Sequence, residues 1–67
     1  MDGKLIGARL KELRGARSQQ EVANDLKLTP MAISGYERGE RIPLDDIKVR
    51  LASYYGKTVQ EIFFTED

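Results

Sequence analysis

The sequence predicts an all-α domain of five short helices. Apolar residues recur at intervals of three and four along the chain, which is the spacing of one buried face of a helix. Glycine or proline separates these apolar groups, and residues that cap helix starts stand before several of them. With 67 residues, the chain is expected to form a single domain over residues 1–67, with its core at about 4–64 and a polar tail at 65–67.

The first two predicted helices have clear start and stop signals. The first is expected over about 4–14, because Gly15 then ends the apolar pattern. The second is expected over about 19–26, because Ser18 and Glu21 form a capping box in which each side chain bonds the other residue's backbone N–H. The residues of these helices expected to be buried are Ile6, Leu10, Leu13, Val22, Ala23 and Leu26.

The third helix follows the second after a very short turn. Thr29 is a side-chain cap, and Pro30 stands at the first helical position, where its missing N–H costs nothing. The helix is expected over about 30–38 and ends at Gly39. Two helices joined by so short a turn cross steeply, which is the helix-turn-helix arrangement whose second helix enters the DNA major groove. The clear inward residues of this third helix are Ile33 and Tyr36.

The last two helices follow the same rules. The fourth is expected between Pro43 and Gly56, and the fifth begins at a capping box formed by Thr58 and Glu61 and ends near Phe63. The residues of the fourth helix expected to face inward are Leu44, Ile47, Leu51, Ala52 and Tyr55.

The composition excludes several kinds of functional site. The chain contains no cysteine and no histidine, so disulfides, zinc fingers and the usual pairs of nucleophile and base cannot form. Its adjacent carboxylates, Asp45-Asp46 and Glu66-Asp67, lack the spacing of a metal-binding loop. An enzyme is therefore not expected, and neither is a cofactor, a metal or a small-molecule ligand.

Charge and hydropathy predict a soluble cytoplasmic protein with no membrane partner. No segment has the apolar length of a secretory signal or of a membrane span. The formal net charge is zero, which predicts weaker non-specific attraction to DNA than a basic domain would show. Basic residues nevertheless exceed acidic ones in residues 1–17, and the reverse holds in residues 42–67. On the fourth helix, Lys48 and Arg50 are expected only to improve solubility.

A longer pattern resembles a known family. The run S-G-Y-E-R-G-E-R-I-P at 34–43 resembles the S-x-Y-E-x-G-x-R-x-P pattern that follows the third helix in lambda-repressor/Cro-type helix-turn-helix regulators, the XRE family. The L-K-E-L-R run at 10–14 and the Q-x-x-x-A run at 19–23 resemble its first two helices, so the similarity covers about residues 5–64. It implies a compact five-helix, lambda-repressor-like fold and a sequence-specific transcriptional regulator of double-stranded operator DNA, a small repressor of bacterial or phage type. The loop at 15–17 is shorter than the family's commonest form.

The resemblance also implies the residues that contact DNA. Base contacts from the third helix are implied for Pro30, Met31, Ala32, Ser34 and Gly35. Phosphate contacts are implied for Arg17, Gln19, Lys27, Thr29, Arg38 and Arg41. A salt bridge that fixes the angle between helices is implied for Arg14 and Glu37. None of the residues expected at the base edges can bond a base bidentately, so readout would depend on thymine methyl groups and on the serine.

Plainer interpretations remain open for several of these residues. Met31 could fill a gap in the core. Gln19, Arg17 and Lys27 could be solvated surface residues without a DNA contact. Tyr36 is expected to be a core residue with its hydroxyl at the rim, rather than a residue that stacks on a base.

The end of the chain predicts self-association. A small core cannot easily cover Ile62, Phe63 and Phe64 together. Val59 and Ile62 can pack inward, which leaves Phe63 or Phe64 to face outward, and these two phenylalanines are the expected homodimer interface. The alternative is that both rings close the core of the monomer. The runner-up function is a protein-interaction module, antitoxin-like or adaptor, on the same fold, and the apolar face of the third helix and the zero net charge favour it.

Overall fold

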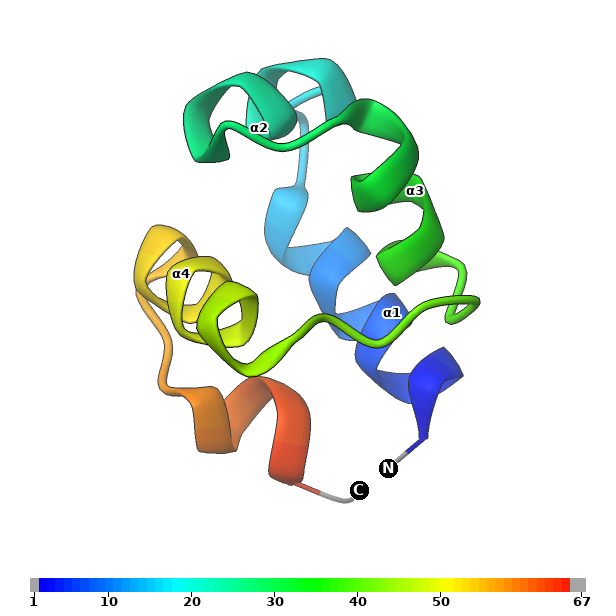
Figure 1. Cartoon of the computed structure of the whole chain (residues 1–67). Helices are drawn as coiled ribbons and strands as arrows, with labels where there is room; N and C mark the ends of the chain where they lie inside the picture. Colours follow the sequence, from blue (N-terminus) through cyan, green and yellow to red (C-terminus); the bar gives the residue numbers. More distant parts are fainter. Residues whose placement is uncertain (1, 66–67) are drawn as a thin grey trace.

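The computed structural model describes residues 2–65 and contains helices but no strands in that range. Its elements are α1 (Gly3–Arg14), α2 (Gln19–Leu26), α3 (Pro30–Glu37), α4 (Asp45–Tyr55) and a π-helical segment, η1 (Gln60–Phe64). The middle of the molecule is occupied by α1, with α2 and α3 toward one end and η1 toward the other (Figure 1). The predicted all-α fold is therefore confirmed. Glu66 and Asp67 of the predicted polar tail lie outside the described residues.

The helix starts are set by local hydrogen bonds to the backbone. Ser18 Oγ accepts the backbone N–H of Glu21 at 3.0 Å, and Thr29 Oγ1 accepts the N–H of Ala32 at 3.1 Å. Each bond satisfies one of the N–H groups that the first turn of a helix leaves without a partner. Because these contacts lie within a few residues of sequence, the predicted starts of α2 and α3 agree with the structure.

The C-terminal part of the fold is capped in the same way. The carboxylate of Glu61 accepts the N–H of Thr58 at 2.9 Å, and the Thr58 hydroxyl accepts the N–H of Glu61 at 3.0 Å, so the predicted capping box forms in full. Gly56 ends α4 with a φ of 69°, a conformation that glycine adopts without strain. α3 ends at Glu37 rather than at the predicted Arg38.

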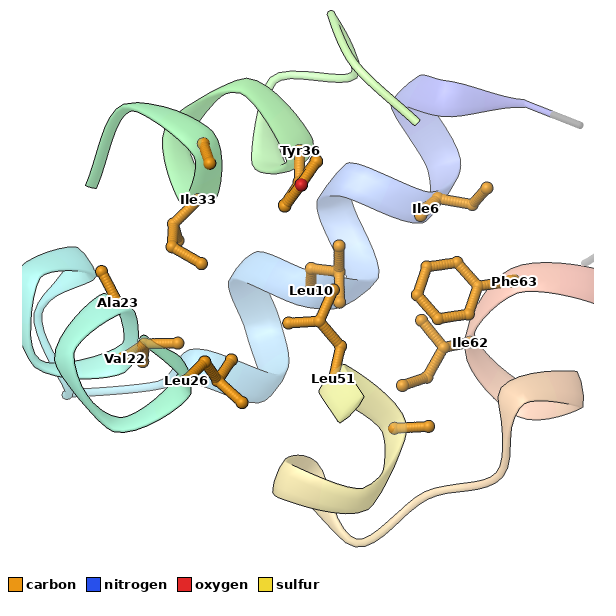
Figure 2. Close-up of a cluster of buried hydrophobic side chains, with 12 residues drawn as sticks. Ile6, Leu10, Val22, Ala23, Leu26, Ile33, Tyr36, Leu51, Ile62 and Phe63 are labelled. Atoms are coloured by element: carbon orange, nitrogen blue, oxygen red, sulfur yellow. The ribbon is translucent and has the colours of Figure 1, made fainter. Parts of the chain in front are cut away.

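One hydrophobic core joins the helices (Figure 2). Leu10 of α1 lies at its centre, with Leu51 of α4 and Phe63 of η1 beside it. The core consists of Ile6, Leu10, Val22, Ala23, Leu26, Ala32, Ile33, Tyr36, Leu51, Ala52, Ile62 and Phe63. Leu13, Ile47 and Tyr55 are partly buried against this core, so nearly all of the predicted inward residues contribute to it.

Two apolar residues lie where the sequence did not predict them. Phe63 is only 3% exposed, so its assignment to a dimer interface is wrong, because its ring fills the space between α1 and η1 (Figure 2). Leu44 is 74% exposed, although its spacing predicted an inward position. It is the N-cap residue of α4, with extended backbone, so the helical periodicity does not yet apply to it.

Lys48 and Arg50 do more than solubilise α4. Lys48 is buried, and its Nζ lies 5.9 Å from the ring centre of Phe63 and 5.3 Å from that of Phe64. A cation above an aromatic face is attracted by the ring's negative face. The Arg50 guanidinium donates a hydrogen bond to the carbonyl oxygen of Leu26 at the end of α2. The two cations therefore attach α4 to η1 and to α2.

The backbones of α1 and α3 meet without side chains between them. A Cβ atom added at Gly7 would lie 2.3 Å from the carbonyl oxygen of Glu37 and 2.8 Å from that of Tyr36. A Cβ at Gly3 would lie 2.9 Å from the carbonyl oxygen of Gly39. Only glycine permits so close an approach, because it has no Cβ atom. The C-terminal end of α3 therefore lies directly against α1.

No helix within residues 2–65 combines the length and the apolar character needed to cross a membrane.

Replacing Gly7 with alanine should destabilise the domain. Overpacking against backbone atoms costs about 3 kcal/mol, which outweighs the ~1 kcal/mol that alanine gains over glycine in a helix interior. The free energy of unfolding, measured by urea denaturation, should therefore fall by about 2 kcal/mol. Ala8→Ser, at the exposed neighbouring position, should change it little. Equal stability of Gly7→Ala and the native chain would contradict the close crossing.

Candidate nucleic-acid interface

Three residues form the outward face of α3. Met31 is 76% exposed, Ser34 is partly exposed, and the side chain of Arg38 is 57% exposed. Their spacing of three and four places them along one side of the helix. We call Met31, Ser34 and Arg38 the outer row of α3. The exposure of Met31 rules out the interpretation that it fills a gap in the core.

Two of the predicted base contacts do not face outward. Ala32 is 8% exposed and belongs to the core, because it lies on the same side of α3 as Ile33 and Tyr36. Gly35 is buried beneath the side chain of Arg41, whose Cδ would lie 2.9 Å from a Cβ at that glycine. The predicted outward position of Ala32 and Gly35 is therefore wrong.

The other predicted base contact, Pro30, is partly buried at the start of α3. Tyr36 is 7% exposed, which agrees with its predicted place in the core. The guanidinium carbon of Arg41 lies 5.9 Å from the centre of the Tyr36 ring. Arg41 thus crosses the edge of α3, beside the outer row rather than within it.

Arg14, Gln19 and Glu37 form a network at the junction of three helices. Arg14 donates from Nε to Glu37 Oε2 at 2.7 Å and from Nη2 to Oε1 at 3.0 Å. Gln19 Nε2 donates to the same Oε1 at 3.0 Å. The hydrogen bonds that Arg14 donates to Glu37 raise the pKa of Arg14 above its usual value. The network joins the end of α1, the first residue of α2 and the last residue of α3.

This salt bridge is largely shielded from water. The side chain of Glu37 is 4% exposed and that of Arg14 is 16% exposed. A buried pair of this kind adds little net stability, but losing one partner leaves the other charge uncompensated. Its geometry therefore fits the scaffold role implied for Arg14 and Glu37.

Arg17 is partly exposed, and its side chain is held by contacts within the domain. Its Nη2 donates to the carbonyl oxygen of Leu13 at 2.9 Å, and its Nε donates to that of Arg14 at 3.2 Å. The guanidinium carbon also lies 5.1 Å from the ring centre of Tyr54 and 5.2 Å from that of Tyr55. These contacts give Arg17 a structural role between α1 and α4, and its implied phosphate contact stays a prediction.

Both tyrosines beside Arg17 have a raised pKa. The Tyr54 hydroxyl donates to Asp25 Oδ2 at 2.6 Å, and this hydrogen bond raises the pKa of Tyr54 above its usual value. Burial raises the pKa of Tyr55 to about 12. A tyrosine hydroxyl is already neutral near pH 7, and the raised pKa values keep both hydroxyls neutral to a higher pH than usual.

The remaining predicted phosphate contacts surround α3. Lys27 and Thr29 are exposed in the turn before it, and Arg41 is exposed after it. Gln19 is partly buried, with one amide hydrogen bonded to Glu37. The Thr29 hydroxyl already accepts the backbone N–H of Ala32 at the start of α3. A phosphate bound there would share this hydroxyl with the backbone.

Arg38 is held by two neighbours in the free protein. Its Nη1 donates to the hydroxyl oxygen of Ser34, and its Nη2 donates to Glu40 Oε1 at 2.8 Å. The bond between the two charged groups raises the pKa of Arg38 and lowers that of Glu40. Both side chains are more than half exposed, so solvent screens the pair.

The sequence interpretation had assigned no role to Glu40 or to Gly7. The role of Glu40 could have been predicted from its charge, which is opposite to that of Arg38 two positions earlier. A glycine inside a predicted helix was a signal for the role of Gly7, because it costs ~1 kcal/mol relative to alanine unless another element must come close.

The described residues contain no group of three or more acidic side chains arranged to hold a metal ion. A family model described as helix-turn-helix, HTH_3, matches residues 10–62 of the chain. The comparison with curated proteins found no match to the chain. The matched range contains α2, α3 and the turn between them, together with Arg14 and Glu37.

Arg14→Ala should destabilise the domain by about 3 kcal/mol, because it leaves the Glu37 carboxylate buried without its cation. Thermal and urea unfolding would measure the loss. Adding Glu37→Gln to this variant should restore part of it, since a neutral amide is easier to bury. Arg38→Ala, which breaks an exposed pair, is the control and should leave unfolding nearly unchanged. Equal stability of the Arg14→Ala and Arg38→Ala variants would exclude the structural role.

Proposed function

The chain belongs to the HTH_3 family of XRE-type helix-turn-helix DNA-binding domains, and we propose that it is a sequence-specific transcriptional regulator. It binds double-stranded operator DNA, places α3 in the major groove and acts as a small repressor of bacterial or phage type. The observation that carries this proposal is the outer row of α3, Met31, Ser34 and Arg38. Met31 and Arg38 are exposed and Ser34 is partly exposed, whereas the residues between them that pack on the core are buried: Ala32, Ile33, Gly35 and Tyr36.

Readout begins with Pro30, Met31 and Ser34 at the base edges. The thioether of Met31 contacts a thymine methyl group, and the hydroxyl of Ser34 can donate to or accept from a base. The side chains of this row are short or flexible, so the backbone of α3 can lie deep in the groove. This geometry supports reading of A·T-rich positions by shape and apolar contact.

Phosphates on both sides of the groove bind Gln19, Lys27, Thr29 and Arg41. Gln19 begins α2, where backbone N–H groups and the helix dipole also favour an anion. Its bond to Glu37 fixes this start relative to α3. Phosphate contacts of this kind set the register of the protein on the duplex, and the base contacts then provide the sequence preference.

The active form is a homodimer. A single neutral domain makes few phosphate contacts, so two copies are needed for tight and specific binding. The interface contains Phe64 and Leu44, which are 52% and 74% exposed. Both neighbour Lys48, because its Nζ lies 5.3 Å from the Phe64 ring centre and its backbone N–H donates to the carbonyl oxygen of Leu44.

Selection of bound sequences from a random duplex library should yield a palindromic consensus. Arg41→Ala should weaken binding to consensus and unrelated duplexes alike, because it removes a phosphate contact. The slope of log affinity against log salt should become shallower by about one. Lys57→Ala, an exposed cation beside η1, is the matched control and should leave affinity and slope unchanged. Failure to enrich any sequence would favour the protein-interaction module instead.

Phe64→Glu should give a folded monomer that has lost most of its operator affinity. In a two-fold interface, the carboxylate introduced in each copy would be buried next to the same carboxylate of the other copy, and the two like charges would repel each other. Sedimentation equilibrium would measure the association, and a mobility-shift titration the affinity. Val49→Glu is the control, since this apolar residue is also exposed on α4 but lies beside Asp25 and Tyr54. A native chain that is monomeric at high concentration would exclude the dimer.

A further inference from the structure

We propose that Arg38 is a specificity-determining residue, and that its guanidinium contacts the edge of a guanine in the major groove rather than a phosphate. The inference rests on the proposed function, because it adds a guanine to the bases that the outer row reads. It also changes the interpretation of the sequence, which had placed this arginine among the phosphate contacts.

The first argument is the position of the guanidinium. Arg38 follows Ser34 by four residues and Met31 by seven, so it lies in the outer row although it caps the C-terminal end of α3. Its Nη1 bonds the Ser34 hydroxyl, which brings the guanidinium back over the preceding turn. The charge therefore lies above the outward face of the helix and not beyond its end.

The second argument is the chemistry of the row. Met31 offers an apolar contact and Ser34 a single hydroxyl, so neither can bond one base at two atoms. The planar guanidinium of Arg38 matches the O6 and N7 acceptors of guanine, which is the commonest specific contact in the major groove. Among the three residues of the row, only this one can distinguish guanine from adenine by two hydrogen bonds.

The third argument is that the guanidinium is already ordered. Ser34 and Glu40 hold it from two sides in the free protein, so less side-chain freedom is lost when it binds. The Glu40 contact is exposed and screened by solvent, so a base edge can replace it. Glu40 then repels nearby phosphates, which weakens affinity without altering which base is preferred.

Arg41 provides the contrast. Its methylene groups cover Gly35, and its guanidinium lies near the Tyr36 ring, at the edge of α3. A cation in that place reaches toward the DNA backbone. The two arginines on either side of Gly39 therefore have different partners, Arg38 a base and Arg41 a phosphate.

The test is selection from a random duplex library with the full chain and the Arg38→Lys variant. Lysine keeps the charge but cannot form the planar pair of bonds. The variant should lose the guanine preference at one position of each half-site and bind the native consensus about tenfold more weakly. Its affinity for unrelated duplexes should not change. Lys57→Arg, a conservative exchange at an exposed cation beside η1, is the control and should retain the complete consensus.

Two further variants test the arrangement around the guanidinium. Ser34→Ala removes the hydroxyl that holds Arg38, so preference should weaken at the same guanine. Glu40→Gln should bind all duplexes more tightly with an unchanged consensus. Circular dichroism should show native helix content for each variant, because every substituted side chain is at least partly exposed.

The possible results separate the inference from the proposed function. An Arg38→Lys variant that selects the native consensus, with every base preference intact, would overturn the assignment of Arg38 and leave the regulator in place. A native chain that selects no sequence would overturn the proposed function, and the assignment with it.

Discussion

Glu37 is attached to the rest of the protein through both its backbone and its side chain. Its carbonyl oxygen lies against Gly7 of α1, at a distance that leaves no room for a Cβ atom. Its carboxylate accepts hydrogen bonds from Arg14 and Gln19. Three helices thus meet at one residue, and the direction of the outer row of α3 depends on it. A small change in the direction of α3 at Glu37 would be amplified at Met31, because Met31 lies at the other end of the helix.

The rest of the fold supports this junction with few apolar residues. A chain of this length has a limited core, so cations cover aromatic rings where aliphatic side chains are lacking. Arg17 packs on Tyr54 and Tyr55, and Lys48 packs on Phe63 and Phe64. These contacts join α4 to the loop after α1 and to η1. Several positive charges are therefore used inside the domain, and fewer remain for general attraction to DNA.

The parts that sequence predicted well are those fixed by local interactions. The starts of α2 and α3 follow from Ser18 and Thr29, whose hydroxyls bond N–H groups three residues away. The positions that were wrong depend on how helices pack. Whether Ala32 faces DNA or the core is decided by the rotation of α3 against α1 and α2, which the spacing of two apolar residues does not determine. Phe63 is buried for the same reason, since the gap between α1 and η1 exists only in the folded chain.

The net charge of the domain bears on how the proposed regulator would discriminate between DNA sequences. Non-specific binding depends on net positive charge, whereas specific binding adds contacts to base edges. The formal net charge here is zero, and Glu40 lies next to Arg38 on the proposed binding face. Both features reduce attraction to every duplex alike, so the ratio of specific to non-specific affinity depends on the contacts to base edges. Because competing sites in a genome far outnumber operators, that ratio decides occupancy. A small neutral domain can thus be selective if the cations on its binding face are directed toward particular base atoms. The hydrogen bond from Arg38 to Ser34 directs one of these cations.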